Sequence, residues 1–555
     1  REAAAHAANK QLLPLVAYWD DVAPANNLHQ ASSVQAVTCM YFTLAGLPSC
    51  VSSSQRFKYL NAVANAHDNK AMSFRPLLEQ FMVEINELNE AGIDVMWKGK
   101  LNKFHPYLLT FAADNLGQNE ARQIKACFSK YFPCRICTTP VTMFGSVFNE
   151  AQCTLRGMQW YRTAQPDHEG YIGDSPLNRI ALYHVSTDPH VDVAHDVYEG
   201  EGKRLVGIYI RALVRAGRTI DEINKRIDAF AFGPNDNPNR PGELTPNIAF
   251  GKPARSQKAC HVRLLLRLLP FLYPLSEVKE NTIRRLFATF HDLIMLVQSL
   301  WLSQKDCDRI ETLSEEYVKL AHESVAQDIP PVNSAKATPS RPTFKTHVLI
   351  HYARSARTLG LPSLLSTLLF EQLHAAVKRR SYVTRNFNNV PLTMAAQIQR
   401  SQWNKRQERV SDTVVGATTY VHHSSFTPVL SSLFAGSDSL TVSKWIEHFG
   451  TRYRSGGMVI LPHHASNLLL ARIESIVLVG SEFRLAVRLS SAPTENSDRR
   501  ALQFRITADA AIIDFGDLLH PLPLDGYAEG ALAQAHRRES TRGRHVEGAQ
   551  REEAV

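Results

Sequence analysis

The apolar positions of residues 12–115 follow the short period of strands, with one helical pattern among them. Strand-like runs occupy residues 12–19, 34–47, 93–97 and 107–113. Between the second and third runs, apolar residues recur every three or four positions from Phe74 to about Asn89, so they share one face of a helix. Strands with one amphipathic helix between them predict an α/β sheet.

Residues 201–327 show helical periodicity instead. The patterns predict helices at about 203–216, 219–230, 255–273, 278–302 and 304–326. Ser303 is a suitable N-cap for the last of these helices. The prolines of residues 330–342 then indicate a connection. Two further helices are expected, at about 343–358 and 363–380.

From about residue 410 the period returns to that of strands. The strand-like runs are residues 413–421, 458–461, 468–479, 483–489 and 502–515. Gly, Ser and Pro separate them, which predicts a small all-β module. Residues 528–555 are charged and hold no aromatic residue, so they are expected to be disordered.

The composition is that of a globular protein. Of the 555 residues, 44% are hydrophobic and 21% are charged, which excludes a wholly disordered or fibrous chain. No stretch offers the roughly twenty nearly uncharged residues that a membrane helix needs, so no membrane segment is expected. Eight cysteines with one closely spaced pair indicate a reducing compartment. The net charge of +9 favours a polyanionic partner.

Three acidic residues are candidates for metal chemistry. Asp20 and Asp114 each follow a strand-like run, and Glu371 lies in a helical pattern in which it shares a face with His374 and Lys378. Three carboxylates suit a pair of Mg²⁺ ions, which prefer oxygen ligands. Two ions about 4 Å apart can stabilise both the attacking and the leaving oxygen of a phosphodiester. Spacing alone still favours the alternative that each is an ordinary surface carboxylate.

A second group combines one CxxC pair with two histidines. Cys134 and Cys137 form the pair, and His347 and His351 are one helical turn apart, about 210 residues later. All four together would supply the tetrahedral ligand set of a structural zinc ion. The alternative is two small buried cysteines and two unrelated histidines, and spacing alone favours it.

Asp192 and His195 allow two interpretations. They are three residues apart, which fits a polar pair at the start of a helix. The same spacing fits an active-site histidine that a carboxylate holds in place, able to move a proton or to contact phosphate. The spacing does not decide between them.

Basic residues gather after the helical pattern that contains Glu371. They include Lys378, Arg379, Arg380 and Arg385. A track of contacts to DNA phosphates is one interpretation, and the net charge supports it modestly. A solvated basic surface is the ordinary alternative.

Six groups of residues, in one order along the chain, resemble a known family. They are Tyr18–Val22 with Tyr41–Pro48, Ala113–Leu116 with Tyr131–Cys137, Asp192–Gly200, Lys345–Tyr352, Leu369–Lys378, and Arg385–Thr393. Together they resemble the DDE transposases with a ribonuclease H-like catalytic domain, in the CACTA-related group of animal transposon proteins. The resemblance covers roughly residues 12–525. The layout is also similar to that of the V(D)J recombinase catalytic subunit.

The resemblance implies a domain organisation. The fold would be an α/β ribonuclease H-like catalytic core, interrupted by an all-α insertion and followed by a small all-β C-terminal module. The implied parts are a first core segment at 12–200, a helical insertion at 201–340, a second core segment at 341–405, the β-rich module at 410–527 and a disordered tail at 528–555. The insertion would pack beside the site and contact DNA.

The resemblance also implies roles for the candidate residues. Asp20, Asp114 and Glu371 would hold a pair of Mg²⁺ or Mn²⁺ ions, with Asp21 as the alternative to its neighbour Asp20. The same resemblance places His195 among the catalytic residues. A structural Zn²⁺ would be held by Cys134, Cys137, His347 and His351, and DNA would be bound by Lys378, Arg379, Arg380 and Arg385.

The implied activity is metal-dependent cleavage of transposon ends and their transfer to target DNA in the nucleus. Water, and then a DNA 3′-hydroxyl, would attack a phosphodiester in line. DNA is the implied partner, a homodimer is left open, and no membrane is involved. The alternative is a domesticated or decayed relative that binds DNA or a protein partner without chemistry.

Overall fold

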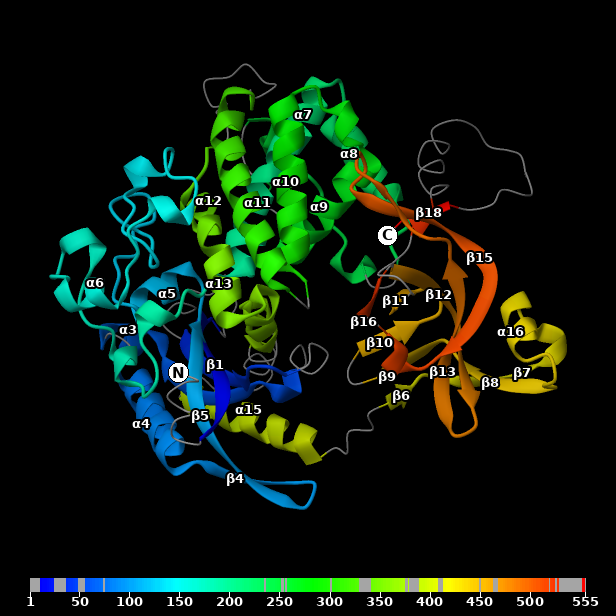
Figure 1. Cartoon of the computed structure of the whole chain (residues 1–555), viewed down its shortest axis with the longest axis horizontal. Coiled ribbons are helices and arrows are strands. Elements are labelled where there is room, and N and C mark those ends of the chain that lie inside the picture. Colours follow the sequence, from blue (N-terminus) through cyan, green and yellow to red (C-terminus); the bar gives the residue numbers. More distant parts are fainter. Residues whose placement is uncertain are drawn as a thin grey trace. The chain divides into compact units, whose positions relative to one another are not determined.

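The structure is a computed structural model, and it divides into two compact units that are described separately below (Figure 1). Unit 1 comprises residues 1–201, 292–325 and 341–409, and unit 2 comprises residues 202–291, 326–340 and 410–555. The residues that the structure describes are 10–23, 36–47, 55–72, 75–233, 236–250, 254, 257–299, 302–328, 341–374, 378, 389–407, 413–448, 451–462, 468–518, 520–524, 527–528 and 552–554.

A mixed five-stranded sheet forms the centre of unit 1. Its order is β3-β2-β1-β5-β4. Strand β1 pairs antiparallel with β2 and parallel with β5, while β3 and β4 pair antiparallel at the two edges. The strands are β1 (Gln11–Val22), β2 (Val37–Leu44), β3 (Tyr59–Asn65), β4 (Ile93–Trp97) and β5 (Lys100–Ala112).

Alternation along β1 divides its side chains between two cores. Leu15, Ala17 and Trp19 face helix α4 (Arg75–Ala91), whose apolar face was predicted from its periodicity. Val16, Tyr18 and Val22 face the opposite way and pack with Phe370 and with helix α15 (Val390–Gln407). Each large apolar side chain that is fully buried contributes about 1.5–3 kcal/mol. By the same alternation, Asp20 belongs to the face that contains Tyr18.

Two strands are longer than their apolar runs predict. Strand β1 continues to Val22, so Asp20 and Asp21 lie inside the strand and pair with Cys39 and Thr38 of β2. Strand β5 starts at Lys100, because its first residues form a hairpin with β4. The apolar run marks only the buried part of each strand, whereas backbone pairing extends beyond it.

The other helices of unit 1 surround this sheet and carry several of the candidate residues. They are α3 (Ala66–Ala71), α5 (Asn115–Ala121), α6 (Met158–Thr163), α11 (Gln304–Glu323), α12 (Phe344–Val348), α13 (Tyr352–Leu359), the π-helix η7 (Val193–Gly202) and a helix that begins at residue 368 and is described to 374. The expected N-cap of α11 is confirmed, because the side chain of Ser303 accepts a hydrogen bond from the Asp306 backbone.

Unit 2 joins helices of the central region to the C-terminal β-sheets. Its helices are α7 (Lys203–Arg215), α8 (Ile220–Ala229), α9 (Ala259–Leu272) and α16 (Pro428–Leu433), and α10 (Asn281–Val297) contains the unit boundary. The backbone of Leu275 donates to the Asp498 carbonyl at 2.9 Å. Arg499 donates to the carbonyl of Phe271 at 2.7 Å, which ties the end of α9 to the β-rich segment.

The C-terminal strands form a three-stranded and a ten-stranded sheet, and every pairing within them is antiparallel. Several short strands, among them β8 to β10, were not predicted from the sequence, because three to five residues are too few for a clear period. The strands are β6 (Thr413–Val415), β7 (Thr418–His422), β8 (Ser439–Ser443), β9 (Trp445–His448), β10 (Thr451–Arg454), β11 (Met458–Pro462), β12 (Leu468–Val479), β13 (Glu482–Ser490), β14 (Thr494–Asn496), β15 (Ala501–Ile513), β16 (His520–Leu524), β17 (Tyr527–Ala528) and β18 (Glu552–Ala554).

The structure therefore has an N-terminal α/β region with a five-stranded sheet, a central helical region and C-terminal antiparallel sheets. Within the tail that was expected to be disordered, residue 528 belongs to β17 and residues 552–554 form β18, while the rest lies outside the described residues. Among the described residues, no helix combines the length and apolar character needed to cross a bilayer.

Candidate functional site

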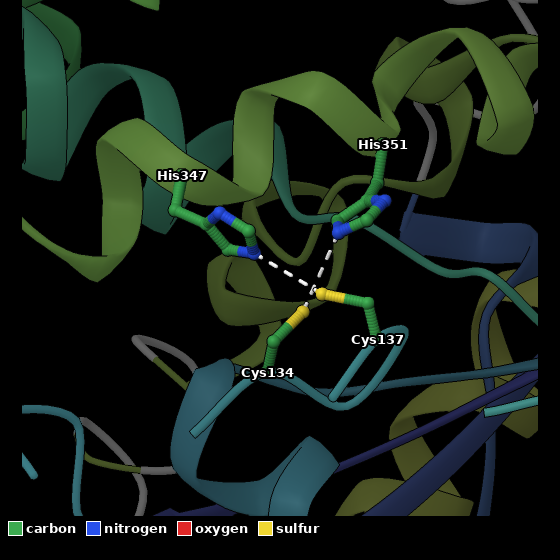
Figure 2. A group of neighbouring side chains, drawn as sticks. All are labelled: Cys134, Cys137, His347 and His351. Carbon is green, nitrogen blue, oxygen red and sulfur yellow. Dashed lines mark hydrogen bonds between the residues drawn. The ribbon is translucent and has the colours of Figure 1, made fainter. Parts of the chain in front are cut away.

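Two cysteines and two histidines from distant parts of unit 1 meet in one buried cluster (Figure 2). The ligand atoms of Cys134, Cys137, His347 and His351 all lie within 4.8 Å of one another. Cys134 Sγ is 3.5 Å from His351 Nε2, and Cys137 Sγ is 3.3 Å from His347 Nε2. We refer to these four residues as the Cys/His cluster. It could hold a structural zinc ion, because two thiols and two imidazoles form a closed tetrahedral set.

The surroundings of the Cys/His cluster fit a cation. Burial disfavours ionisation of Cys134, yet the hydrogen bond from Cys137 and the charge and hydrogen bonds of the histidines bring the pKa of the Cys134 thiol well below its usual range. Burial and Cys134 in turn raise the pKa of the Cys137 thiol, and the charge of Cys134 raises the pKa of His351 to about 9 against the effect of burial. A bound zinc ion would therefore displace protons from Cys137 and His351. The ring of Phe144 stacks on His347 with centroids 4.1 Å apart and fixes the orientation of that ring. Thiolate and neutral imidazole are the forms that bind zinc.

A carboxylate that was not predicted from the sequence supports one of the histidines. Glu150 Oε1 lies 2.7 Å from His351 Nδ1, and Glu150 Oε2 accepts a hydrogen bond from Arg354 at 2.8 Å. Outer carboxylates of this kind orient metal-binding histidines. No spacing rule connects residue 150 with residue 351, so the sequence offered no signal for the contact.

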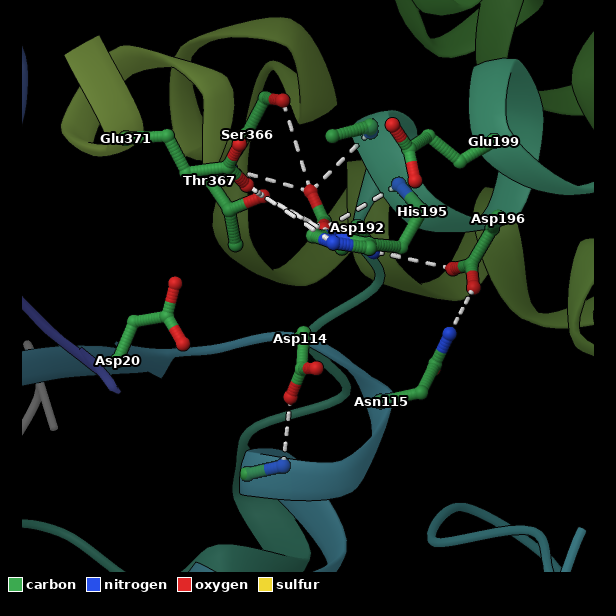
Figure 3. A network of polar contacts seen from close by, with 12 residues as sticks. Asp20, Asp114, Asn115, Asp192, His195, Asp196, Glu199, Ser366, Thr367 and Glu371 are labelled. Carbon is green, nitrogen blue, oxygen red and sulfur yellow. Dashed lines mark hydrogen bonds and ion pairs between the residues drawn. The ribbon is translucent and has the colours of Figure 1, made fainter. Parts of the chain in front are cut away.

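Three candidate carboxylates surround a common space in unit 1 (Figure 3). Asp20 comes from β1, Asp114 from the residues after β5, and Glu371 from the helix that begins at 368. The side chains of Asp20 and Glu371 are 32% and 33% exposed, so a ligand can reach both of them. In the described part of the chain, only the Cys/His cluster places three or more metal-ligating atoms within 4.8 Å of one another. The carboxylates are therefore more widely spaced than the Cys/His ligands.

Asp20 lies in a strongly acidic environment. Burial and then the negative charge of Asp114 raise the pKa of Asp20 to about 7, with a smaller contribution from Glu371. Hydrogen bonds from the Tyr18 hydroxyl at 3.0 Å and the Asp21 backbone at 2.7 Å oppose this increase. A bound cation would relieve the repulsion between these carboxylates.

Asp21 is engaged elsewhere. Its carboxylate pairs with Lys70 at 2.6 Å and accepts a hydrogen bond from the Thr38 hydroxyl at 2.6 Å. Neighbouring side chains of a strand point to opposite faces. Of the two adjacent aspartates, Asp20 therefore shares the site with Asp114 and Glu371, as Figure 3 shows.

Asp114 also has a structural role. One of its carboxylate oxygens accepts a hydrogen bond from the Gly117 backbone at 2.7 Å and caps helix α5. A Cβ atom at Gly117 would lie 2.8 Å from Trp19 Nε1, so glycine permits this close packing. The second carboxylate oxygen of Asp114 does not take part in the cap.

The geometry of both interpretations of Asp192 and His195 is present. Asp192 directly precedes η7 and accepts a hydrogen bond from the Ala194 backbone at 3.2 Å, as at a helix start, and it also holds the His195 ring beside Glu371. Asp192 Oδ2 lies 2.5 Å from His195 Nδ1, and His195 Nε2 lies 3.9 Å from Glu371 Oε1. Burial alone would lower the pKa of His195, but the Asp192 carboxylate raises it to about 10. Burial likewise opposes ionisation of Asp192, but the contact with His195 brings its pKa to about 2. The pairing therefore favours the imidazolium form of His195.

Thr367 joins these groups and was not predicted. Its hydroxyl donates to Asp192 at 2.7 Å, and it also lies 3.1 Å from Glu371 Oε1. Its backbone N–H donates to Asp192 at 3.1 Å, which fixes the start of the Glu371 helix against η7. Burial raises the pKa of the Glu371 carboxyl above its ordinary value, and His195 opposes that shift.

A buried polar network connects the Cys/His cluster with this carboxylate site. Arg135, inside the CxxC pair, donates to Asn115 Oδ1 at 2.7 Å. Asn115 in turn donates to Asp196 at 2.6 Å, and Tyr352, next to His351, donates to the same carboxylate at 3.3 Å. Asp196 is fully buried, and its Oδ2 also accepts a hydrogen bond from the Asp192 backbone at 3.1 Å, which links the network to the group around His195 and Glu371.

The predicted DNA-binding residues are described only in part. Lys378 is exposed, and its charge is the second cause, after burial, that lowers the pKa of His374 to about 4. Arg379, Arg380 and Arg385 lie outside the described residues. The track of phosphate contacts therefore stays a prediction.

Comparison with known proteins gives no family for this chain. No protein-family model matches it, and no curated protein is significantly similar to it. The functional assignment therefore depends on the residues and on the geometry that the structure gives them.

Proposed function

We propose that the protein is a metal-dependent DDE transposase-type enzyme that cuts and joins DNA phosphodiesters at Asp20, Asp114 and Glu371. The observation that carries the proposal is the meeting of these three side chains around one space, from segments far apart in the chain (Figure 3). The raised pKa of Asp20, caused by burial and by the charge of Asp114, supports a site that takes up cations.

The arrangement of the sheet is in keeping with a ribonuclease H-like core. Strand β1 lies between antiparallel β2 and parallel β5; Asp20 lies in β1, and Asp114 follows the end of the adjacent strand β5. Residues at neighbouring ends of parallel strands lie at one edge of a sheet. This topology belongs to the α/β class and supports the resemblance.

Each residue has a definable task in the proposed reaction. Asp20, Asp114 and Glu371 would hold two Mg²⁺ or Mn²⁺ ions, which neutralise charge on the phosphate and activate water. One carboxylate oxygen of Asp114 caps α5, and the other would be available to a metal ion. An oxygen nucleophile forms a bond to phosphorus as the bridging P–O bond breaks, in line.

We assign His195 the role of a cation and not of a general base, because the Asp192 carboxylate raises its pKa to about 10 against the effect of burial. Its charge instead faces Glu371 and is available to a phosphate oxygen. Asp192 and Thr367 orient this ring and act as positioning residues.

The experiment is nicking of supercoiled plasmid by the purified chain with Mn²⁺ or Mg²⁺. Glu371→Gln and Asp20→Asn should each lower the rate by at least about 100-fold, because each removes a ligand charge. Asp94→Asn, on the exposed hairpin of β4, is the matched control and should leave the rate unchanged. Nicking that persists in Glu371→Gln contradicts the proposal, and DNA binding without any cleavage supports the non-catalytic alternative.

A further inference from the structure

A hollow of about 750 Å³ lies between helix α15 and strands β2 and β3 of unit 1. Its main lining side chains are Phe42, Tyr59, Gln399, Arg400, Gln402 and Trp403. We propose that this hollow binds an unpaired base of a single-stranded nucleic acid. The proposal goes beyond the proposed activity, because none of the lining residues belongs to the carboxylate site.

Aromatic side chains give the hollow its stacking surfaces. Phe42 and Tyr59 are half-buried and stack on each other with centroids 5.2 Å apart and planes 29° apart. Trp403 is 60% exposed on α15, whereas tryptophan is usually among the more buried residues. Every base has a flat π-face, so exposed aromatic rings bind single strands with little dependence on sequence.

The charge of the hollow suits a polyanion. Arg400 is exposed, and no described residue forms an ion pair with it. None of the described residues that line the hollow carries a carboxylate. Helix α15 as a whole contains Arg400, Lys405 and Arg406 and no acidic residue. A guanidinium beside aromatic rings is the combination that contacts a phosphate while the base stacks.

The hollow is held open by the packing of α15. The side chain of Gln402 donates to the Lys58 carbonyl at 2.8 Å and accepts from the Leu60 backbone at 3.5 Å. Met394 and Ile398 of the same helix are buried against the sheet. A volume of about 750 Å³ falls within the range of roughly 300–1,000 Å³ of preformed ligand pockets.

A proline-rich peptide is the main competitor, because aromatic grooves also bind such peptides. Arg400 forms no ion pair with a described residue, and the described part of the lining has no carboxylate, which together favour the nucleic acid. The net charge of +9 favours it as well.

The test is binding of a labelled twenty-nucleotide oligothymidylate to the full chain, followed by fluorescence anisotropy at low salt without added Mg²⁺ or Mn²⁺. Trp403→Ala should weaken binding roughly tenfold or more, and Trp403→Phe should retain most of it, because a ring still stacks. Arg400→Ala should reduce the slope of log affinity against log salt by about 0.7. The matched controls are Leu392→Ala on the same helix and Arg309→Ala on α11, both exposed in the wild type.

The proposal is overturned if Trp403→Ala and Arg400→Ala bind as the wild type does, or if oligoproline binds and oligothymidylate does not. Circular dichroism of each variant establishes that it is folded. The binding assay contains no Mg²⁺ or Mn²⁺, so it reports single-strand binding separately from metal-dependent nicking. Loss of nicking therefore concerns the carboxylate site, and loss of single-strand binding concerns the hollow.

Discussion

Glu150 accepts a hydrogen bond from His351 at Nδ1, 2.7 Å away, while Nε2 of the same ring lies 3.5 Å from Cys134 Sγ. The contact fixes both the tautomer and the orientation of the imidazole, because only Nε2 is left to face the two thiols. His347, in contrast, has a buried Nδ1 without a hydrogen-bond partner among the described residues. The two histidines of the Cys/His cluster are thus supported differently.

Removal of the Glu150 carboxylate should weaken zinc binding. We expect Glu150→Ala to lower zinc affinity roughly 10- to 100-fold, as is typical when an outer carboxylate is lost. Competition with a chromogenic chelator measures the change. Glu79→Ala, at an exposed position of α4, should bind zinc like the wild type. Equal affinities for both variants would show that the contact does not support the metal.

Zinc should stabilise unit 1 through the Cys/His cluster. Its two halves are about 210 residues apart, so an ion that joins them closes a very long loop. Free zinc at 100 times its Kd should stabilise the folded state by about 2.7 kcal/mol. Metal analysis should find one zinc per chain in the wild type and none in Cys134→Ser/Cys137→Ser, whose Tm should no longer respond to zinc. Cys127→Ser, outside the cluster, should still respond.

Asp192→Asn should lower the pKa of His195 from about 10 towards the ordinary histidine value of about 6.5. The raised pKa means that the ion pair contributes fully to stability below about pH 6.5 and loses its contribution as the pH rises towards 10. The pKa of Asp192 is lowered to about 2, so the stabilisation that its ionised form provides is lost as the pH falls from about 4 towards 2. NMR titration of His195 measures the shift. An unchanged titration in Asp192→Asn would contradict this account.

His291 should make unit 2 sensitive to acid. Burial, and then the charges of Arg500 and Arg267, lower the pKa of His291 to about 3. The unfolded chain takes up this proton below about pH 6.5, so stability is lost as the pH falls from there towards 3. The slope from this group is about 1.4 kcal/mol per pH unit. Urea unfolding at several pH values should show that the free energy of unfolding falls less steeply with decreasing pH in His291→Phe than in the wild type. The exposed control His422→Phe should behave like the wild type.

Arg135 should couple the Cys/His cluster to the carboxylate site. Its guanidinium donates to Asn115 and, through two nitrogens, to the carbonyl of His190. The ammonium group of a lysine cannot reproduce the planar arrangement of donors in the guanidinium. Arg135→Lys should therefore lower the free energy of unfolding by about 1–3 kcal/mol. It should also release zinc faster, while Arg309→Lys should do neither. Stopped-flow zinc release and urea unfolding are the two measurements.

Local sequence patterns predicted much of the secondary structure. The apolar face of α4, the capped start of α11 and the strands from β11 to β13 follow from periods that a few neighbouring residues establish. The same local spacing put His347 and His351 one turn apart. Such patterns show which side chains share a face, and they hold because the backbone geometry repeats.

The partners of those faces were decided only by the tertiary structure. Spacing alone favoured unrelated cysteines and histidines, yet packing of α12 and the turn that follows brings both pairs into one cluster. The pleat and pairing of β1 placed Asp20, and not Asp21, beside Asp114, and no sequence rule linked Glu150 with His351. The physical reason is that contacts between distant segments depend on how the whole core packs. The local sequence determines only the geometry of each segment.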